Sequence, residues 1–113
     1  MALERDGVVT DVSIIIPILN EEENLPPLID EITETMADRA YEIIFVDDGS
    51  TDDTVNILKN LRSNNPRIRI LKLKRNYGKA TAMAAGFDIA RGKTSITMDG
   101  DLQDDPAEIP RFL

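Results

Sequence analysis

The sequence of 113 residues contains no cysteine and no histidine. Without cysteine it has neither a disulfide framework nor a thiolate metal site, as is typical of proteins from a reducing compartment. Without histidine, a serine nucleophile activated by histidine and a histidine-ligated zinc are both excluded within this chain. Any metal must therefore be held by oxygen ligands.

Long apolar runs are also missing. No stretch reaches the roughly 20 apolar residues of a membrane span. The first ten residues, which include Glu4, Arg5 and Asp6, lack the apolar segment of a signal peptide. We therefore expect this chain to be cytoplasmic. Its length predicts one domain, which we place at residues 12–113 behind an N-terminal extension at residues 1–11.

Positive charge is scarce, because 13 Lys and Arg face 21 Asp and Glu and leave a formal net charge of -8. A nucleic-acid partner is excluded, since neutralising a phosphate backbone requires a basic face. A diphosphate ligand would need a divalent cation between its phosphates and the carboxylates of the protein, because the cation reverses the local sign of charge. If the ligand is a nucleotide, the composition therefore implies a metal.

Short apolar runs rich in β-branched residues predict four strands, at residues 12–16, 41–46, 68–73 and 94–98. Pro17 closes the first, and the alternation with Arg and Lys in the third indicates a strand near the edge of the sheet. Apolar residues at spacings of three and four predict three intervening helices. Their expected inward residues are Leu25, Leu28, Ile29, Ile32 and Met36, then Val55, Leu58 and Leu61, then Met83, Ala84 and Phe87.

This alternation of strands and helices predicts an α/β fold with a mostly parallel sheet, right-handed crossovers and helices on both faces. Gly92 is the expected C-terminal cap of the third helix. In such sheets ligands bind beyond the carboxyl ends of the strands, near the point where the strand order reverses. The polar residues that follow the first, second and fourth strands are therefore expected to meet at one edge.

The fourth strand leads into Asp99, Gly100, Asp101 and Gln103. Glycine between the two aspartates allows a tight turn that directs both carboxylates at one small volume. Such oxygen ligands suit Mg²⁺ or Mn²⁺, which share them with substrate phosphates. The alternative is an ordinary polar turn, since Asp and Gly are common turn residues.

Asp47 and Asp48 are adjacent carboxylates at the end of a buried strand, so they need hydrogen-bond donors. A nucleobase N–H or a ribose hydroxyl would serve. The alternative is that one caps the following helix while the other is solvated. Asn20 and Glu21, after the first strand, are either ligand-binding residues or a simple helix entry.

The segment from Lys74 to Lys79 is basic and precedes the third helix. Free backbone N–H groups at a helix N-terminus add to side-chain charge there, so this segment suits an anion such as phosphate. A solvated turn with ordinary surface lysines is the alternative.

Four segments, at residues 13–25, 42–54, 75–93 and 98–110, together resemble family 2 glycosyltransferases, and within them the polyprenyl-phosphate branch. The resemblance implies the N-terminal, Rossmann-like half of a GT-A fold. It also implies that Asp99, Asp101 and Gln103 bind the metal. The residues it implies for the donor, a nucleoside diphosphate sugar, are Pro17, Asn20, Glu21, Val46, Asp47 and Asp48, to which we add Leu19, Lys79, Asp99 and Gly100. Leu19 departs from the aromatic residue that is frequent in the family.

The resemblance further implies a metal-dependent, inverting transfer of a hexose from a UDP- or GDP-sugar to a polyprenyl phosphate or other acceptor. We expect this chain to be the donor-binding part of a longer enzyme at the cytoplasmic face of the membrane, inactive alone and prone to self-association through an uncovered sheet edge. Two alternatives are a receiver-like Mg²⁺-binding domain and a non-catalytic interaction domain. No general base can be assigned.

Overall fold

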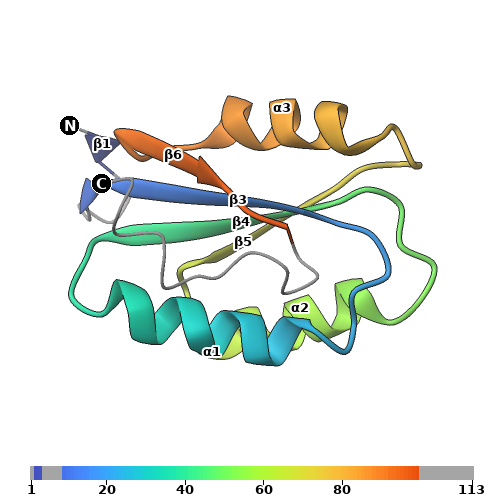
Figure 1. Ribbon diagram of the computed structural model, residues 1–113, viewed down its shortest axis with the longest axis horizontal. Coiled ribbons are helices and arrows are strands. Elements are labelled where there is room, and N and C mark those ends of the chain that lie inside the picture. Colours follow the sequence, from blue (N-terminus) through green and yellow to red (C-terminus); the bar gives the residue numbers. More distant parts are fainter. Residues whose placement is uncertain (1, 4–8, 100–113) are drawn as a thin grey trace.

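The computed structural model describes residues 2–3 and 9–99. Strands and helices alternate along it, which confirms the predicted α/β class (Figure 1). A short antiparallel pair, β1 (Ala2–Leu3) and β2 (Val9–Thr10), comes first. The elements that follow are β3 (Val12–Ile18), α1 (Leu25–Met36), β4 (Tyr41–Asp47), α2 (Thr54–Asn64), β5 (Ile68–Lys72), α3 (Lys79–Ile89) and β6 (Thr94–Thr97).

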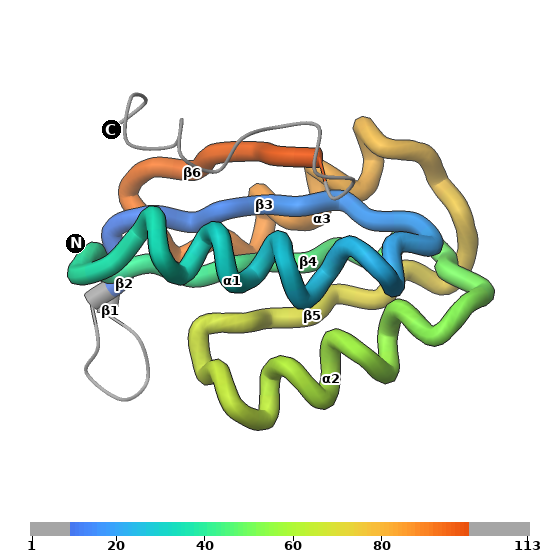
Figure 2. Tube along the Cα trace, turned by 60° about the horizontal axis from the view of Figure 1, so that its bottom comes forward, coloured from blue at the N-terminus to red at the C-terminus, as the bar shows by residue number. Residues whose placement is uncertain are grey.

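The main sheet is parallel and has the strand order β5-β4-β3-β6. From β3 the chain builds outward through β4 to β5, and then crosses to the other side of β3 to form β6 (Figure 2). β5 therefore lies at one edge of the described sheet, as its partly charged sequence predicted. The strand order reverses between β3 and β6, and this is where an open α/β sheet forms a ligand crevice.

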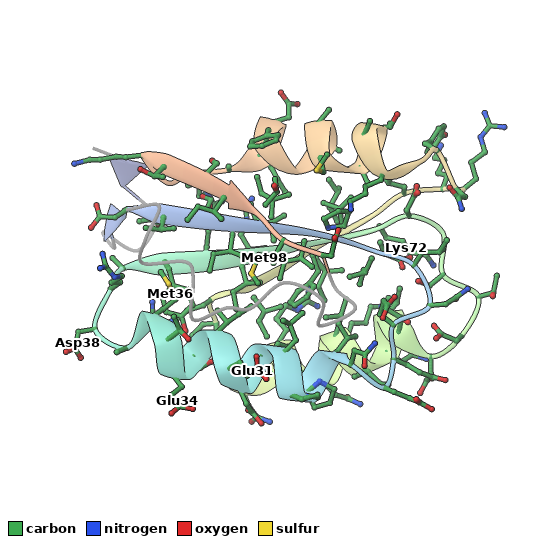
Figure 3. The ribbon with its side chains drawn as sticks, viewed as in Figure 1. Glu31, Glu34, Met36, Asp38, Lys72 and Met98 are labelled. Carbon is green, nitrogen blue, oxygen red and sulfur yellow. The ribbon has the colours of Figure 1, made fainter. Side chains whose placement is uncertain are left out.

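Helices α1 and α2 cover one face of the sheet and bury its larger apolar cluster (Figure 1). The five predicted inward residues of α1 are all buried, so that prediction is confirmed. Met36 and Met98 point into this layer, while Glu31, Glu34 and Asp38 are exposed (Figure 3). Complete burial of one aliphatic side chain of α1, such as Leu28, contributes about 1.5–3 kcal/mol to the free energy of unfolding.

The inward face of α2 differs slightly from the prediction. Leu58 is buried and Leu61 packs against the cluster, but Ile57 takes the third place instead of Val55. Thr54 at the start of the helix is also fully buried, and hydrogen bonds at the site described below satisfy its hydroxyl. The buried face of α2 is therefore rotated relative to the predicted face. It includes Thr54 in the first turn, next to the loop after β3.

The predicted inward face of α3 is wrong. Phe87 is 48% exposed, and the residues buried against the sheet are Ala82 and Gly86. A Cβ added at Gly86 would lie 2.5 Å from Cγ2 of Ile15 and 3.1 Å from Cγ2 of Val46. The helix lies so close to the sheet that only its smallest residues fit there, and this turns Phe87 outward.

Gly92 is not the cap of α3, which ends at Ile89 with Ala90 in an extended conformation. Its role is close packing, because a Cβ at Gly92 would lie 2.7 Å from the backbone N of Ser13. The strand limits also shift: β3 continues through Pro17 to Ile18, and β4 includes Asp47.

A buried polar cluster joins Gly92 to the sheet at the end where the strands begin. Glu42 accepts hydrogen bonds from the Ser13 hydroxyl (2.6 Å) and from the backbone N–H of Arg91 (2.7 Å), and it forms an ion pair with Arg69 (2.9 Å). The N–H of Gly92 donates to Oγ of Ser13 at 2.8 Å. This cluster fixes the α3–β6 connection far from the carboxyl ends of the strands.

Among the helices that the structure describes, none has both the length and the apolar character needed to cross a membrane.

Candidate nucleotide and metal site

An open cleft of about 320 Å³ lies at the carboxyl end of the sheet, where the strand order reverses between β3 and β6. Lys72, at the end of β5, marks the same edge in Figure 3. The cleft is lined by Pro17, Ile18, Leu19, Glu21, Asp48, Asn76, Gly78, Lys79 and Asp99. Six of these nine were predicted site residues, so the structure brings together the loops after β3, β4, β5 and β6. Its volume is near the lower end of ligand pockets.

Asp99 reaches the cleft directly from the end of β6. The N–H of Met98 donates to the Ile15 carbonyl at 3.0 Å and so extends the pairing of β6 with β3, while the Met98 side chain is buried in the core. Asp99 then forms an ion pair with Lys79, the first residue of α3. One third of the Asp99 side chain remains exposed.

The donor chemistry of Asp99 fits a divalent cation. Its carboxylate is a hard oxygen ligand that faces an open cleft, and its ion pair with an ammonium group shows that it is placed to hold positive charge. Within residues 2–3 and 9–99, no three acidic side chains gather closely enough to hold a metal by themselves. The predicted residues Gly100, Asp101 and Gln103 lie outside the described residues.

Asp48 is buried and obtains its donors from the chain itself. Its two carboxylate oxygens accept the backbone N–H groups of Tyr77 (2.8 Å) and Gly78 (3.0 Å). Gly49, with φ of 95°, packs closely on the same segment, since a Cβ there would lie 2.9 Å from the backbone N of Asn76. Asp48 therefore neither caps α2 nor is solvated: it anchors the loop before α3, which forms one wall of the cleft.

Asp47 and Val46 are fully buried and do not line the cleft. The Asp47 carboxylate accepts the N–H of Ser50 at 3.3 Å, and Val46 belongs to the apolar cluster beneath α3. Of the two adjacent aspartates, Asp48 is the one that reaches the cleft beside Asp99. This differs from the predicted placement of Asp47.

Asn20 connects the loop after β3 to the loop after β4. Its backbone has φ of 54°, and its side-chain oxygen accepts the N–H of Thr51 at 2.8 Å and that of Asp52 at 3.3 Å. Its own N–H donates to Oγ of Ser50 at 2.9 Å. Asn20 does not line the cleft, and it holds together the two loops that do.

Glu21 lies in the cleft lining and also belongs to the entry of α1, because its carboxylate accepts the side-chain amide of Asn24 at 2.6 Å. Its N–H donates to Oγ1 of Thr54 at 3.1 Å, and the Thr54 hydroxyl donates to Asp52. The buried Thr54 thus connects the start of α2 to both loops.

Of the residues in the cleft lining, Ile18 was not predicted, while Asn76 and Gly78 lie within the basic segment 74–79 that was predicted to suit an anion but were not chosen individually as site residues. A signal for the last two was present, because an Asn and a Gly two positions apart before a helix indicate a turn with backbone N–H groups available for hydrogen bonding. Gly78 does have a positive φ of 100°.

Thr54→Val is expected to raise the pKa of Asp52. Burial acts to raise this pKa, but hydrogen bonds outweigh it and hold the pKa of Asp52 below its ordinary value; those donated by the Thr54 hydroxyl and N–H contribute most, and backbone hydrogen bonds involving Glu22 and Asp52 add to them. Ionised Asp52 therefore stabilises the fold above its unfolded pKa of about 4, and this contribution is lost as pH falls through the lower folded value. NMR titration of the Asp52 carboxyl measures the change, and an unaltered pKa in the variant would refute the role of the hydroxyl.

The sequence matches the family described as Glycosyl transferase family 2 over residues 13–113. The chain belongs to glycosyl transferase family 2. Two similar sequences in this family have a polyprenyl phosphate in their names. A dodecaprenyl-phosphate galacturonate synthase of Rhizobium johnstonii is 46% identical over 106 residues. An undecaprenyl-phosphate 4-deoxy-4-formamido-L-arabinose transferase of Yersinia pestis is 47% identical over 106 residues.

These matches cover 91% and 90% of this family 2 chain but only 31% and 32% of the two relatives. The chain thus spans about a third of the length of the curated relatives it matches. The match extends across every loop that lines the cleft, including Asp99.

Solved structures confirm the GT-A fold of this family 2 chain. A mannosyltransferase from Pyrobaculum calidifontis, in complex with GDP-Man and Mn²⁺, superposes with a TM-score of 0.75 at 26% identity, over 82% of this chain and 28% of that one. The Staphylococcus aureus TarS fragment 1-349 in complex with UDP-GlcNAc gives a TM-score of 0.71 at 25% identity, over 81% and 27%. Family membership favours a transferase over the receiver-like alternative.

Proposed function

We propose that the cleft binds the diphosphate and nucleoside of a sugar donor together with Mg²⁺ or Mn²⁺, and that this chain is the donor-binding part of a hexosyltransferase. One observation carries the proposal: at the reversal of strand order, Asp99 enters an open cleft and already holds a positive charge. Similar structures hold GDP-Man with Mn²⁺ and UDP-GlcNAc, which supports both parts of the ligand.

The cation would be held by Asp99, Asp101 and Gln103. When bound, it neutralises charge on the leaving diphosphate as the bond to the sugar breaks. Lys79 is placed to contribute a further positive charge to the phosphates, because it lines the cleft at the N-terminus of α3.

The nucleoside would lie against the loops after β3 and β4. Pro17 and Leu19 supply apolar surface there, and Leu19 is 39% exposed. Glu21 offers a carboxylate to a ribose hydroxyl or a base N–H. Asn20, Val46 and Asp47 would support this wall from behind, since none of them lines the cleft.

We also propose that the parent enzyme transfers the sugar with inversion to a polyprenyl phosphate at the cytoplasmic face of the membrane. The names of similar proteins support a lipid phosphate acceptor. Such an acceptor is already anionic, so the attack needs no general base to remove a proton.

Calorimetry with GDP and UDP tests the proposed donor site. We expect at least one of them to bind in Mn²⁺ and neither to bind when EDTA removes the metal, because the phosphates and the cleft carboxylates repel each other without a cation. Asp101→Ala should abolish the metal-dependent heat. If Mn²⁺ binds with the same affinity whether or not GDP or UDP is present, the proposal is contradicted.

A further inference from the structure

The ion pair between Lys79 and Asp99 crosses the cleft and joins the start of α3 to the end of β6. It places an ammonium group of the protein on the same carboxylate that the proposed function assigns to a divalent cation. The Lys79 side chain is 58% exposed and that of Asp99 is 33% exposed. The pair is therefore open to solvent and to ions that enter the cleft.

The backbone that carries Lys79 is fixed. The N–H of the preceding Gly78 donates to buried Asp48 at 3.0 Å, and the carbonyl of Gly78 accepts the N–H of Ala82 at 3.0 Å. Only the flexible side chain of Lys79 is left to move. Rotation about the bonds of this four-carbon side chain changes the position of the ammonium group without moving the backbone.

The electrostatics at the start of α3 also favour an anion. A helix N-terminus carries partial positive charge, so a lysine at the first position is unfavourable there. The first turn of α3 has no acidic residue that could offset it. Asp99 provides the negative charge from another element, and a phosphate group would satisfy the same need.

We propose that Lys79 is the resident counter-ion of Asp99, that it competes with the divalent cation for this carboxylate, and that cation binding releases it. This inference rests on the proposed function, because it takes Asp99 as a cation ligand. Two positive charges cannot share one carboxylate at close range without mutual repulsion. Once released, the ammonium group stays in the cleft, where the diphosphate would lie.

Binding of Mn²⁺ alone, followed by the electron paramagnetic resonance signal of the free ion, tests the competition. Lys79→Met should bind Mn²⁺ at least about tenfold more tightly than the wild type, since the competing charge is gone. Lys93→Met is the matched control: it removes the same charge from an exposed position at the opposite end of the sheet, and its affinity should stay within about twofold of the wild type. Unchanged or weaker Mn²⁺ binding by Lys79→Met overturns the inference.

A second readout follows the ammonium group itself. In the wild type, titration with diamagnetic Mg²⁺ should move the side-chain ¹⁵N resonance of Lys79 to the position that it has in Asp99→Asn without metal. A Lys79 resonance that Mg²⁺ does not move overturns the inference.

The two proposals fail in different ways. If Asp99→Asn loses Mn²⁺ binding but Lys79→Met binds it like the wild type, the donor site stands and only the counter-ion role is wrong. If Asp99→Asn binds Mn²⁺ as well as the wild type, Asp99 is not a cation ligand and both proposals are wrong.

Discussion

Asp99→Asn is expected to weaken Mn²⁺-dependent binding of a nucleoside diphosphate at least about 100-fold, equivalent to roughly 2.7 kcal/mol. The substitution preserves the shape of the side chain but removes the negative charge that faces the cleft. A hard divalent cation binds a carboxylate far better than an amide, and the cation connects the phosphates to the protein. Calorimetry with GDP or UDP in excess Mn²⁺ gives the two affinities.

A matched control separates this effect from a general change in net charge. Asp88→Asn removes one negative charge from an exposed position on the outer side of α3, and we expect its affinity to stay within about twofold of the wild type because exposed distant charges are screened. Equal affinities for Asp99→Asn and Asp88→Asn would show that Asp99 does not bind the cation.

Asp48→Ala is expected to lower the free energy of unfolding by about 3 kcal/mol, because hydrogen bonds to a charged group are worth roughly 1.5–3 kcal/mol each and two are lost. The backbone N–H groups of Tyr77 and Gly78 would be left without their acceptor. Urea denaturation measures the loss. Hydrogen exchange of the same two amides should accelerate, since they lose the anchor that holds the loop before α3.

Glu42→Gln provides the comparison for Asp48→Ala. Glu42 is also a buried carboxylate with backbone and side-chain donors, but it lies at the opposite end of the strands. The Glu42→Gln variant should have a lower free energy of unfolding and an unchanged nucleotide affinity, whereas Asp48→Ala should lower both quantities. Wild-type stability in Asp48→Ala would mean that the loop is held by other contacts.

The layers of the fold could be predicted because their signals are local. Runs such as Ile14 to Ile16 are apolar on both sides of a strand, and the spacing in α1 points to one face only. The prediction for α3 failed because most side chains of this helix are small or apolar on nearly every side. The spacing of its apolar residues therefore could not show which face is buried. The close contact of Gly86 with Ile15 and Val46 made the choice, and that contact depends on tertiary packing.

The site was predicted in part for the same reason. Residues that directly follow a parallel strand must reach the carboxyl edge, so Glu21, Asp48 and Asp99 could be placed in one cleft from sequence. The partners of Asp48 could not be foreseen, because its donors come from a loop about thirty positions later. The conformation of that loop depends on two glycines with positive φ, Gly49 and Gly78.

Paramagnetic relaxation by Mn²⁺ in the presence of GDP or UDP tests the position of the site most directly, because it acts through distance and identifies each affected amide. We predict that the amide signals of Gly78, Lys79 and Asp99 broaden at the lowest Mn²⁺ concentrations, while those of Ser13 and Glu42 at the far end of the strands stay sharp. Broadening centred on any other part of the chain, or spread evenly over it, would contradict a metal–nucleotide site in this cleft.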